Sequence, residues 1–365
     1  MKKRIAVAAV LAVFLAASTY AQTTRYFVYV TNTAADNISA YAINPSTGKL
    51  LTVGGSPFAA GAGPVSIAAD PKAKFLCVVN GAVNSVSAYT ISPSTGALSA
   101  IKGSPFSVGL KPEGITVDPL GKFLYVANDG SGNVSAFAIN STTGELSAVK
   151  GSPFAVGKHG SYPTGIAVDP TGTFLYVANW SGNVFAYKIK PSTGALILVN
   201  GSPFATGDGP WEIGVTPTGK FLYVTNSESA TISAFALKPS TGVLSAVSGS
   251  PFATGKSPNG FAVDSAAKFF FVANNGNATV SAYSINPTNG ALSAVGGSPF
   301  AAGSGPETIA IDPTGKFLYV ANHAGNNISA YTINPGTGAL SGVGGSPFAA
   351  GANPSDVRIV TVTGP

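Results

Sequence analysis

Short hydrophobic segments recur along almost the whole chain and are separated by clusters of turn residues. The segments are rich in Val, Ile, Phe and Tyr, and Gly, Pro, Asn and Ser lie between them. Segments of this length and composition, bounded by residues that favour turns, are typical of β-strands. The pattern therefore predicts an all-β protein.

Two short motifs each occur seven times. The first is a hydrophobic strand that ends in Asn, and its Asn residues are 47 to 51 residues apart. Its copies are Tyr29–Asn32, Cys77–Asn80, Tyr125–Asn128, Tyr176–Asn179, Tyr223–Asn226, Phe271–Asn274 and Tyr319–Asn322. The second motif, Gly-Ser-Pro-Phe, begins at Gly55, Gly103, Gly151, Gly201, Gly249, Gly297 and Gly345. Two independent markers with the same count predict seven structural repeats.

Each repeat contains four predicted strands, which we name A to D. In the third repeat they are Ile115–Asp118, Phe123–Asn128, Val134–Ile139 and Leu146–Phe154. Strand B is continuously hydrophobic, as expected when neighbouring sheets cover both of its faces. Strand D contains Pro in every copy, which places it at an outer edge, and strand A is then innermost, along a central channel. The repeats predict a seven-bladed β-propeller of four-stranded antiparallel blades.

The two ends of the repeat region predict how the ring closes. The first repeat starts at Tyr26, already in strand B, so its blade lacks a strand A. The last repeat is followed by an extra strand, Ser355–Val362. We expect this C-terminal strand to pair as strand A of blade 1, which removes open sheet edges. Residues 22–365 then form a single domain.

The N-terminus has the three-part layout of a secretory signal peptide. Met1–Arg4 is basic, Ile5–Ala17 is apolar, and Ser18–Ala21 contains small residues. We predict cleavage after Ala21 and a periplasmic or secreted mature protein. No later apolar run is long enough to cross a bilayer, so no membrane insertion is expected.

Composition argues against several other classes. The single Cys77 cannot form an internal disulfide, and it stands where other repeats have Tyr or Phe, so a buried structural thiol is expected. The net charge is +6 and the lysines are scattered, which argues against nucleic-acid binding. Two distant His residues give no zinc spacing, and the Asp129–Asn133 loop is too short for a calcium loop. We expect no metal, no cofactor and a monomer.

The strand Tyr-Val-Thr-Asn or Tyr-Val-Ala-Asn, with a preceding Asp-Pro-Thr-Gly-Lys turn, resembles the YVTN-repeat propellers and the related lactonase family, which includes 6-phosphogluconolactonase-like proteins. The resemblance implies a seven-bladed propeller. In that family strand A typically begins Gly-Pro-Arg-His and strand B is followed by Asn-Glu-Leu. The corresponding segments here, such as Lys111–Gly114 and Gly209–Glu212, contain no Arg-His pair. The resemblance therefore carries the fold but not that family's catalytic residues.

Strand order separates two faces of the ring. The D-to-A crossings and the B-to-C loops share one face, here called the top, and the A-to-B and C-to-D loops share the bottom. The bottom loops repeat with little change, which favours turn chemistry. The chemically unusual side chains lie in the top loops, so we expect any functional site there. The Asn that ends each strand B occurs in all seven repeats, which favours a structural role.

One group of top-face residues lies around the junction of blades 4 and 5. The crossing into blade 4 carries three extra residues, and both tryptophans lie on adjacent crossings and loops. Aromatic rings beside carboxylates are typical of sites for sugars and other polyols. The predicted ligand-binding residues are His159, Tyr162, Trp180, Trp211, Glu212 and Asp129. The alternative is that both tryptophans only fill gaps between the two blades.

A second group consists of Glu113, Glu212 and Glu307, each within two residues of the Pro that opens strand A, and His323 in the following loop of blade 7. They should ring the channel mouth. Confined carboxyl groups have raised pKa values and can act as general acids or bases, so these four are the candidate catalytic residues. The alternative is a solvated acidic rim with no chemistry.

Two functions are consistent with these residues. The first is an exported propeller that binds a neutral, sugar-like ligand or a protein partner at the top face. The second is a lactone hydrolase in which His323 or His159 is the base and a channel-mouth Glu is the acid. Phosphorylated substrates are disfavoured, because they would meet carboxylates where they need cations.

Overall fold

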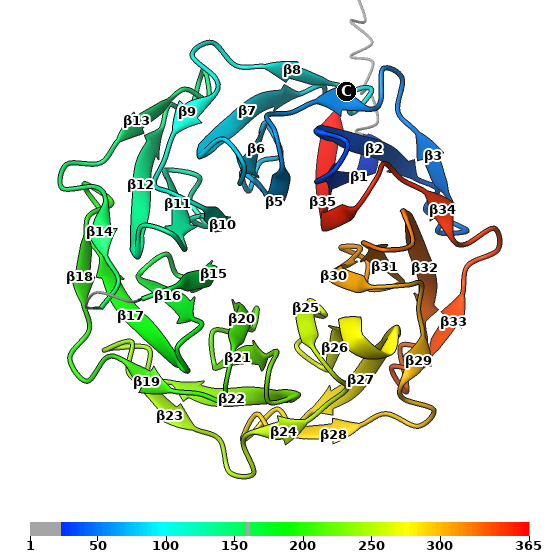
Figure 1. Cartoon of the computed structure of the whole chain (residues 1–365). Helices are drawn as coiled ribbons and strands as arrows, with labels where there is room; N and C mark the ends of the chain where they lie inside the picture. Colours follow the sequence, from blue (N-terminus) through cyan, green and yellow to red (C-terminus); the bar gives the residue numbers. More distant parts are fainter. Residues whose placement is uncertain (1–22, 158–160, 365) are drawn as a thin grey trace, which may run out of the picture.

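The computed structural model describes residues 23–157 and 161–364. Seven antiparallel β-sheets stand around a central axis as the blades of a propeller (Figure 1). Within the described residues the one helical element is η1, a 3-10 turn at Asn275–Asn277 on the top face. The predicted all-β, seven-bladed propeller is confirmed. The predicted signal peptide, residues 1–21, lies outside the described residues.

Strands A and B form the inner half of each blade. The A strands, innermost in Figure 1, are, from blade 1 to blade 7, β35 (Pro354–Gly364), β5 (Pro64–Ala69), β10 (Pro112–Val117), β15 (Pro163–Val168), β20 (Pro210–Val215), β25 (Pro258–Val263) and β30 (Pro306–Ile311). The B strands are β1 (Thr23–Asn32), β6 (Phe75–Asn80), β11 (Phe123–Asn128), β16 (Phe174–Asn179), β21 (Phe221–Asn226), β26 (Phe269–Asn274) and β31 (Phe317–Asn322). In blades 2 to 7 every residue of strand B is buried, because the neighbouring blades cover both of its faces.

Strands C and D form the outer half. The C strands are β2 (Asn37–Ile43), β7 (Ser85–Ile91), β12 (Asn133–Ile139), β17 (Asn183–Ile189), β22 (Thr231–Leu237), β27 (Thr279–Ile285) and β32 (Asn327–Ile333). The first D segments are β3 (Leu50–Thr52), β8 (Leu98–Ala100), β13 (Leu146–Ala148), β18 (Leu196–Leu198), β23 (Leu244–Ala246), β28 (Leu292–Ala294) and β33 (Leu340–Gly342). The second D segments are β4 (Phe58–Ala59), β9 (Phe106–Ser107), β14 (Phe154–Ala155), β19 (Phe204–Ala205), β24 (Phe252–Ala253), β29 (Phe300–Ala301) and β34 (Phe348–Ala349).

Strand D therefore differs from the expected single strand Leu146–Phe154. It is an outer edge, as predicted, but it consists of two short segments that both pair with strand C. Between β13 and β14 the chain turns at Gly151, whose φ is 93°. The ladder is interrupted there because Pro153 has no N–H to donate.

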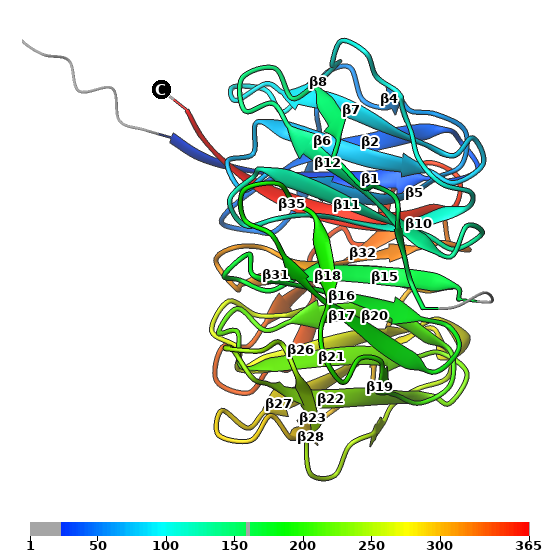
Figure 2. The ribbon, with the colours of Figure 1, turned by 90° about the vertical axis from the view of Figure 1, so that its left-hand side faces the viewer.

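The C-terminal strand closes the ring as predicted. β35 pairs antiparallel with β1, with Tyr29 opposite Arg358, and so supplies strand A of blade 1. Figure 2 shows the ends of β1 and β35 side by side, extending beyond the blades. No helix within the described residues is long and apolar enough to cross a membrane.

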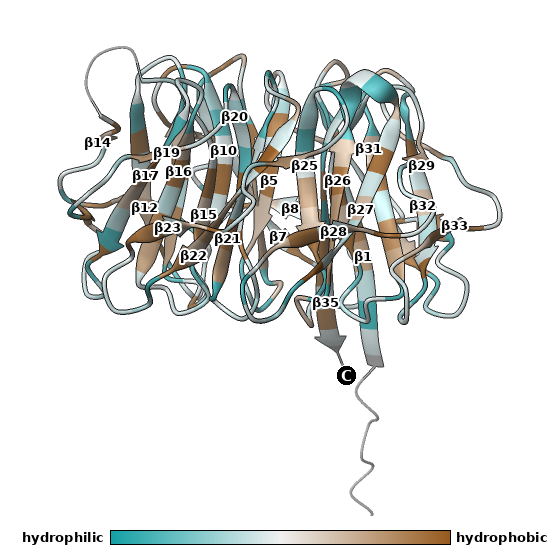
Figure 3. Cartoon of the chain, turned by 90° about the horizontal axis from the view of Figure 1, so that it is seen from below, coloured by the Kyte–Doolittle hydropathy of each residue, from teal (hydrophilic) through white to brown (hydrophobic). Residues whose placement is uncertain are grey.

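The bottom loops hold neighbouring blades together. In five C-to-D loops a glycine carbonyl accepts a hydrogen bond from a Tyr in strand B of the preceding blade, and the Tyr125 hydroxyl donates to Gly194 O at 2.9 Å. Equivalent bonds run from Tyr29, Tyr176, Tyr223 and Tyr319, the last across the closure of the ring. A buried bond of this kind contributes about 1 kcal/mol. Hydrophobic residues fill the blade centres and hydrophilic residues gather at their ends (Figure 3).

The repeated polar residues are structural, as predicted. At the bottom, Oδ1 of Asp118 accepts hydrogen bonds from the backbone N–H groups of Lys122 and Phe123, both at 2.6 Å. At the top, the Asn128 amide does not stabilise its own turn but donates to strand C, to Asn133 Oδ1 at 2.8 Å and Ser135 Oγ at 2.9 Å. Cys77 is buried, which confirms the structural thiol and raises its pKa to about 12.

Candidate functional site

A β-bulge at the start of every strand A brings two consecutive side chains to the top of the channel. In blade 3, Pro112 pairs with Asn128 and Ile115 with Val126, so the two residues Glu113 and Gly114 oppose a single residue of strand B. The register shifts at the same place in the other six blades. Such bulges redirect side chains next to functional sites. Here they explain why both positions after the strand-opening Pro can reach one cavity.

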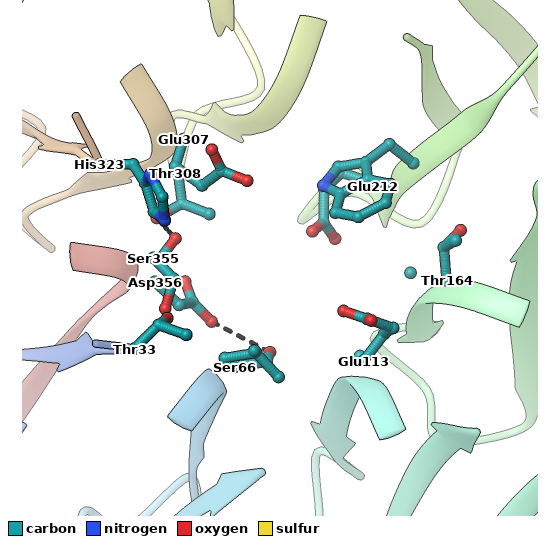
Figure 4. A pocket seen from close by; sticks show the side chains of 14 residues that line it. Thr33, Ser66, Glu113, Thr164, Glu212, Glu307, Thr308, His323, Ser355 and Asp356 are labelled. Carbon is teal, nitrogen blue, oxygen red and sulfur yellow. Dashed lines mark hydrogen bonds between the residues drawn. The ribbon is translucent and has the colours of Figure 1, made fainter. Parts of the chain in front are cut away.

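These bulges enclose a cavity of about 200 Å³ at the top of the channel. All four predicted catalytic residues line it: Glu113, Glu212, Glu307 and His323. Asp356 and several Ser and Thr residues, Ser66 among them, also line it, and the labelled carboxyl groups point into it from several sides of the ring (Figure 4). The sequence prediction that these residues ring the channel mouth is therefore consistent with the structure, although their roles stay predictions.

Burial raises the pKa of each of these carboxyl groups toward neutrality. The pKa of Glu113 rises to about 7, mainly through burial and then through the charges of Asp129 and Glu307. Burial beside Asp356 raises the pKa of Glu212 to about 8. Burial also raises the pKa of Glu307 to about 7. Groups with such pKa values exchange protons readily near pH 7.

Hydrogen bonds distinguish the individual carboxyl groups. Glu307 Oε2 accepts from the Asn275 amide at 3.0 Å, and the Asn259 side chain also bonds this carboxyl group. These donors favour its ionised form against the effect of burial. The one hydrogen bond that the described residues make to the Glu212 carboxyl group is the 3.2 Å bond that Oε1 accepts from the adjacent Ile213 N–H. Between these two residues, the hydrogen bonds favour ionisation more at Glu307 than at Glu212.

Asp356 was missed by the sequence analysis. Its Oδ2 accepts from Ile67 N–H at 2.9 Å and Ser66 Oγ–H at 3.1 Å, and its Oδ1 accepts from Val357 N–H at 2.8 Å. Burial nevertheless raises its pKa to about 6. Asp356 follows Pro354 by two residues, as Glu212 follows Pro210. That shared spacing was the available signal, because β35 is the strand A of blade 1.

His323 is a neutral hydrogen-bond donor in this arrangement. Burial lowers its pKa. The Asn353 amide nitrogen lies 3.3 Å from His323 Nδ1 and 3.4 Å from the His323 carbonyl oxygen. An amide nitrogen donates hydrogen bonds and does not accept them, so this contact requires Nδ1 to be the acceptor and the ring proton to be on Nε2. The predicted role of His323 as a base fits this tautomer less well than a role as a donor.

A second chamber of about 590 Å³ continues the channel toward the bottom. It shares Ser66, Glu212 and Asp356 with the upper cavity, and its wall includes Arg358. Arg358 occupies the fourth position after the strand-opening Pro, where the other blades have only Ala, Gly or Thr. Its charge lowers the pKa values of Glu212 and Asp356 and so partly offsets their burial.

The aromatic residues form a separate pocket of about 300 Å³ beside the channel mouth. Trp180 and Trp211 meet edge to face, with ring centroids 5.7 Å apart and planes at 84°. The pocket is completed by Glu113, Asp129, Tyr162 and Thr164. Both indoles are half-buried and Tyr162 is 48% exposed, so the rings leave apolar surface open besides packing on each other. His159, the remaining predicted ligand-binding residue, lies outside the described residues.

The extra residues of the blade 4 crossing help to position this pocket. In blades 1, 2 and 6 the Asn ending strand B accepts from a glycine N–H of the crossing, as Asn80 does from Gly61 at 3.1 Å. In blade 4, Asn179 Oδ1 accepts from Tyr162 N–H at 2.6 Å instead. Trp180 N–H in turn donates to Tyr162 O at 3.0 Å. The equivalent backbone bond occurs in the other blades as well, for example from Asp129 N–H to Lys111 O at 2.9 Å, so the longer crossing is distinguished by the bond from Tyr162 to Asn179.

Comparison with known protein families identifies the family to which this chain belongs. The model of the family "Lactonase, 7-bladed beta-propeller" matches six overlapping segments: 16–109, 58–161, 111–209, 154–256, 200–304 and 250–358. The chain belongs to this lactonase family. A comparison with curated protein sequences gave no significant match.

Solved structures similar to this lactonase-family propeller share its fold at low sequence identity. A protein from Bacteroides uniformis, for which 6-phosphogluconolactonase activity has been proposed, has a TM-score of 0.80 and 20% identity over 92% of this chain and 99% of its own. A similar protein from Bacteroides fragilis has a TM-score of 0.80 and 22% identity over 92% and 98%. The periplasmic gluconolactonase of Pseudomonas aeruginosa has a TM-score of 0.79 and 21% identity over 93% and 100%.

No cluster of three or more His, Cys, Asp or Glu residues in the described part of this lactonase-family chain has the arrangement of a metal site. The carboxyl groups of the upper cavity are instead held by protein donors: Asn275 for Glu307, and Ser66 for Asp356. What the site offers chemically is a set of protonatable groups around a cavity, with an aromatic pocket beside it.

Proposed function

We propose that this propeller is a lactone hydrolase that binds a neutral sugar lactone at the top of its channel. The observation that carries the proposal is the convergence of Glu113, Glu212 and Glu307, with pKa values raised to about 7, 8 and 7, in one cavity of a lactonase-family propeller. Ester hydrolysis near neutral pH needs a base that activates water and an acid that protonates the leaving oxygen.

The hydrogen bonds suggest a division of labour. Glu307, as a carboxylate, takes a proton from water while the water oxygen attacks the lactone carbonyl carbon. The bond from that carbon to the ring oxygen breaks, and the protonated Glu212 gives its proton to the ring oxygen. The product is the open-chain hydroxy acid. His323 Nε2–H can donate to the carbonyl oxygen as negative charge develops on it.

Charge selects a neutral substrate. The described residues that line the upper cavity include four carboxyl groups and no Lys or Arg. A phosphate group would therefore meet acceptors rather than donors, and its burial beside carboxylates would be unfavourable. This distinguishes the proposal from 6-phosphogluconolactone hydrolysis.

Binding without hydrolysis is the second candidate function, and the exposed aromatic pocket favours it. A neutral, sugar-like ligand would stack on Trp180 and Trp211 whether or not it was turned over. A protein partner at the top face and export to the periplasm or the medium stay predictions.

The test is hydrolysis of glucono-1,5-lactone and of its 6-phosphate by the purified chain, measured as acid release above the buffer rate. We expect the neutral lactone to be opened at least tenfold more efficiently. The matched control is Glu145→Gln in a bottom loop, which should behave as wild type. Faster turnover of the phosphate ester would contradict the neutral-substrate proposal, and no turnover of either would leave binding as the function.

A further inference from the structure

We infer that the substrate has at least two sugar units, with the lactone ring in the carboxyl-lined cavity and a second pyranose in the aromatic pocket. The inference rests on the proposed function and names its substrate class: the lactone of an oxidised disaccharide or longer oligosaccharide. It is supported by the position of the two cavities beside each other and by the chemistry of the second one.

The two cavities are adjacent. Glu113, Thr164 and Trp211 line both the upper channel cavity and the aromatic pocket. Trp180, Tyr162 and Asp129 line only the aromatic pocket, whereas Glu307 and His323 line only the channel cavity. The proposed ligand passes Trp211 from one cavity to the other, and each cavity keeps residues of its own.

The volumes assign one ring to each cavity. The channel cavity, with about 200 Å³, is smaller than the aromatic pocket, with about 300 Å³. Small-molecule sites typically enclose roughly 300–1,000 Å³. Neither cavity alone exceeds the lower end of that range, and together they fall within it. The groups suited to acid-base chemistry are in the smaller cavity, so the lactone ring belongs there.

The aromatic pocket has the chemistry of a pyranose subsite. The perpendicular indoles of Trp180 and Trp211 present two apolar surfaces at an angle, and the half-exposed Tyr162 adds a third ring. Asp129 and Glu113 supply acceptors for hydroxyl groups at the same pocket. The six described residues that line it include no cation. The apolar faces of a sugar can stack on the aromatic rings while its hydroxyl groups donate to the carboxylates. A neutral second sugar therefore fits this pocket.

The pocket also sets a direction for the ligand. After the Asn that ends strand B, the other blades have Thr33, Gly81, Asp129, Ser227, Asn275 and His323, so blade 4 alone places an indole there. The one other tryptophan, Trp211, opens the neighbouring blade 5. A longer substrate therefore extends from the channel over blades 4 and 5 and not toward blade 7, where Glu307 and His323 lie.

The test compares glucono-1,5-lactone with cellobiono-1,5-lactone by kcat/KM. We expect the disaccharide lactone to be opened at least tenfold more efficiently by the wild type. Trp180→Ala should bring the ratio of the two kcat/KM values close to 1, and Trp180→Phe should restore most of the preference. Leu198→Ala, on the exposed outer edge of blade 4, is the control and should leave the ratio unchanged. Equal kcat/KM values for the two lactones in the wild type would overturn the inference.

A binding measurement keeps the inference testable if no lactone is opened. The chain contains two tryptophans, and both line the aromatic pocket, so intrinsic tryptophan fluorescence reports on this pocket alone. We expect cellobiose to change the emission at a concentration at least tenfold lower than glucose does. Hydrolysis of glucono-1,5-lactone without any advantage of the disaccharide in either assay would contradict the second subsite but not the proposed hydrolase activity. Tight cellobiose binding without hydrolysis of either lactone would support the second subsite and contradict the proposed hydrolase activity.

Discussion

The two faces of the propeller are built from the same repeat but obey different constraints. At the bottom, each C-to-D glycine rests on a Phe of the preceding blade: a Cβ on Gly96 would lie 2.4 Å from Phe27 Cδ1, and one on Gly194 would lie 2.4 Å from Phe123 Cδ1. At the top, the bulge residues face an open cavity, and in blades 3, 5 and 7 they are Glu113, Glu212 and Glu307. The comparison teaches that repeated residues in this chain maintain the fold, whereas residues that differ between blades form the site.

The largest effect is expected from the top face. Glu212→Gln removes the proposed proton donor and keeps the size of the side chain. We expect lactone hydrolysis to fall about 10²- to 10⁴-fold, which is the usual contribution of general acid catalysis, with little change in KM. The measurement is kcat and KM for glucono-1,5-lactone. A loss smaller than threefold would remove Glu212 from the mechanism.

The bottom face should respond in stability and not in chemistry. Gly194→Ala forces a Cβ onto Phe123 at a residue whose φ is 73°. We expect a loss of about 2–4 kcal/mol in the free energy of unfolding, from strain and overpacking.

The matched control for that change is Gly201→Ala. Its φ is 88°, but a Cβ there would meet nothing within 4 Å. Only the backbone cost of about 1–2 kcal/mol should remain. Denaturant unfolding of both variants, with kcat measured on the folded protein, checks the pair. Equal losses in the two variants would show that the contact with Phe123 contributes nothing.

A smaller effect concerns stability against pH. The pKa of Glu212 is raised from 4.5 to about 8 in the folded protein, so folding is favoured when the group is protonated. That stabilisation is fully present below pH 4.5 and is lost as pH rises through about 8. Glu212→Gln has no such group. The free energy of unfolding of this variant, relative to that of the wild type, should therefore increase by about 1–3 kcal/mol between pH 5 and 9. A constant difference across this range would contradict the raised pKa.

Much of the fold could be predicted because its signals are local and repeated. The Asn-terminated strand and Gly-Ser-Pro-Phe gave the seven blades, and the extra segment Ser355–Val362 gave the closure that β35 makes with β1. The split of strand D was missed, since Gly151 and Pro153 interrupt a ladder whose sequence still reads as one edge strand.

The site was predicted in part. Glu113, Glu212, Glu307 and His323 were expected at the channel mouth because strand order places them on one face, and they do line one cavity. Asp356 was missed because it lies in the closing strand, outside the repeat that drew attention to the others. The tautomer of His323 depends on Asn353, thirty residues away in sequence, which no local pattern reveals.

The pH dependence of kcat/KM for glucono-1,5-lactone, corrected for the spontaneous reaction, is the most direct test of the proposed mechanism. An ionised base and a protonated acid, with pKa values of about 7 for Glu307 and about 8 for Glu212, predict activity that rises through pH 7, peaks between the two values and falls above pH 8. In Glu212→Gln the fall above pH 8 should disappear. A profile that is flat from pH 5 to 9, or one that Glu212→Gln leaves unchanged, would contradict the claim that the channel-mouth carboxyl groups carry the reaction.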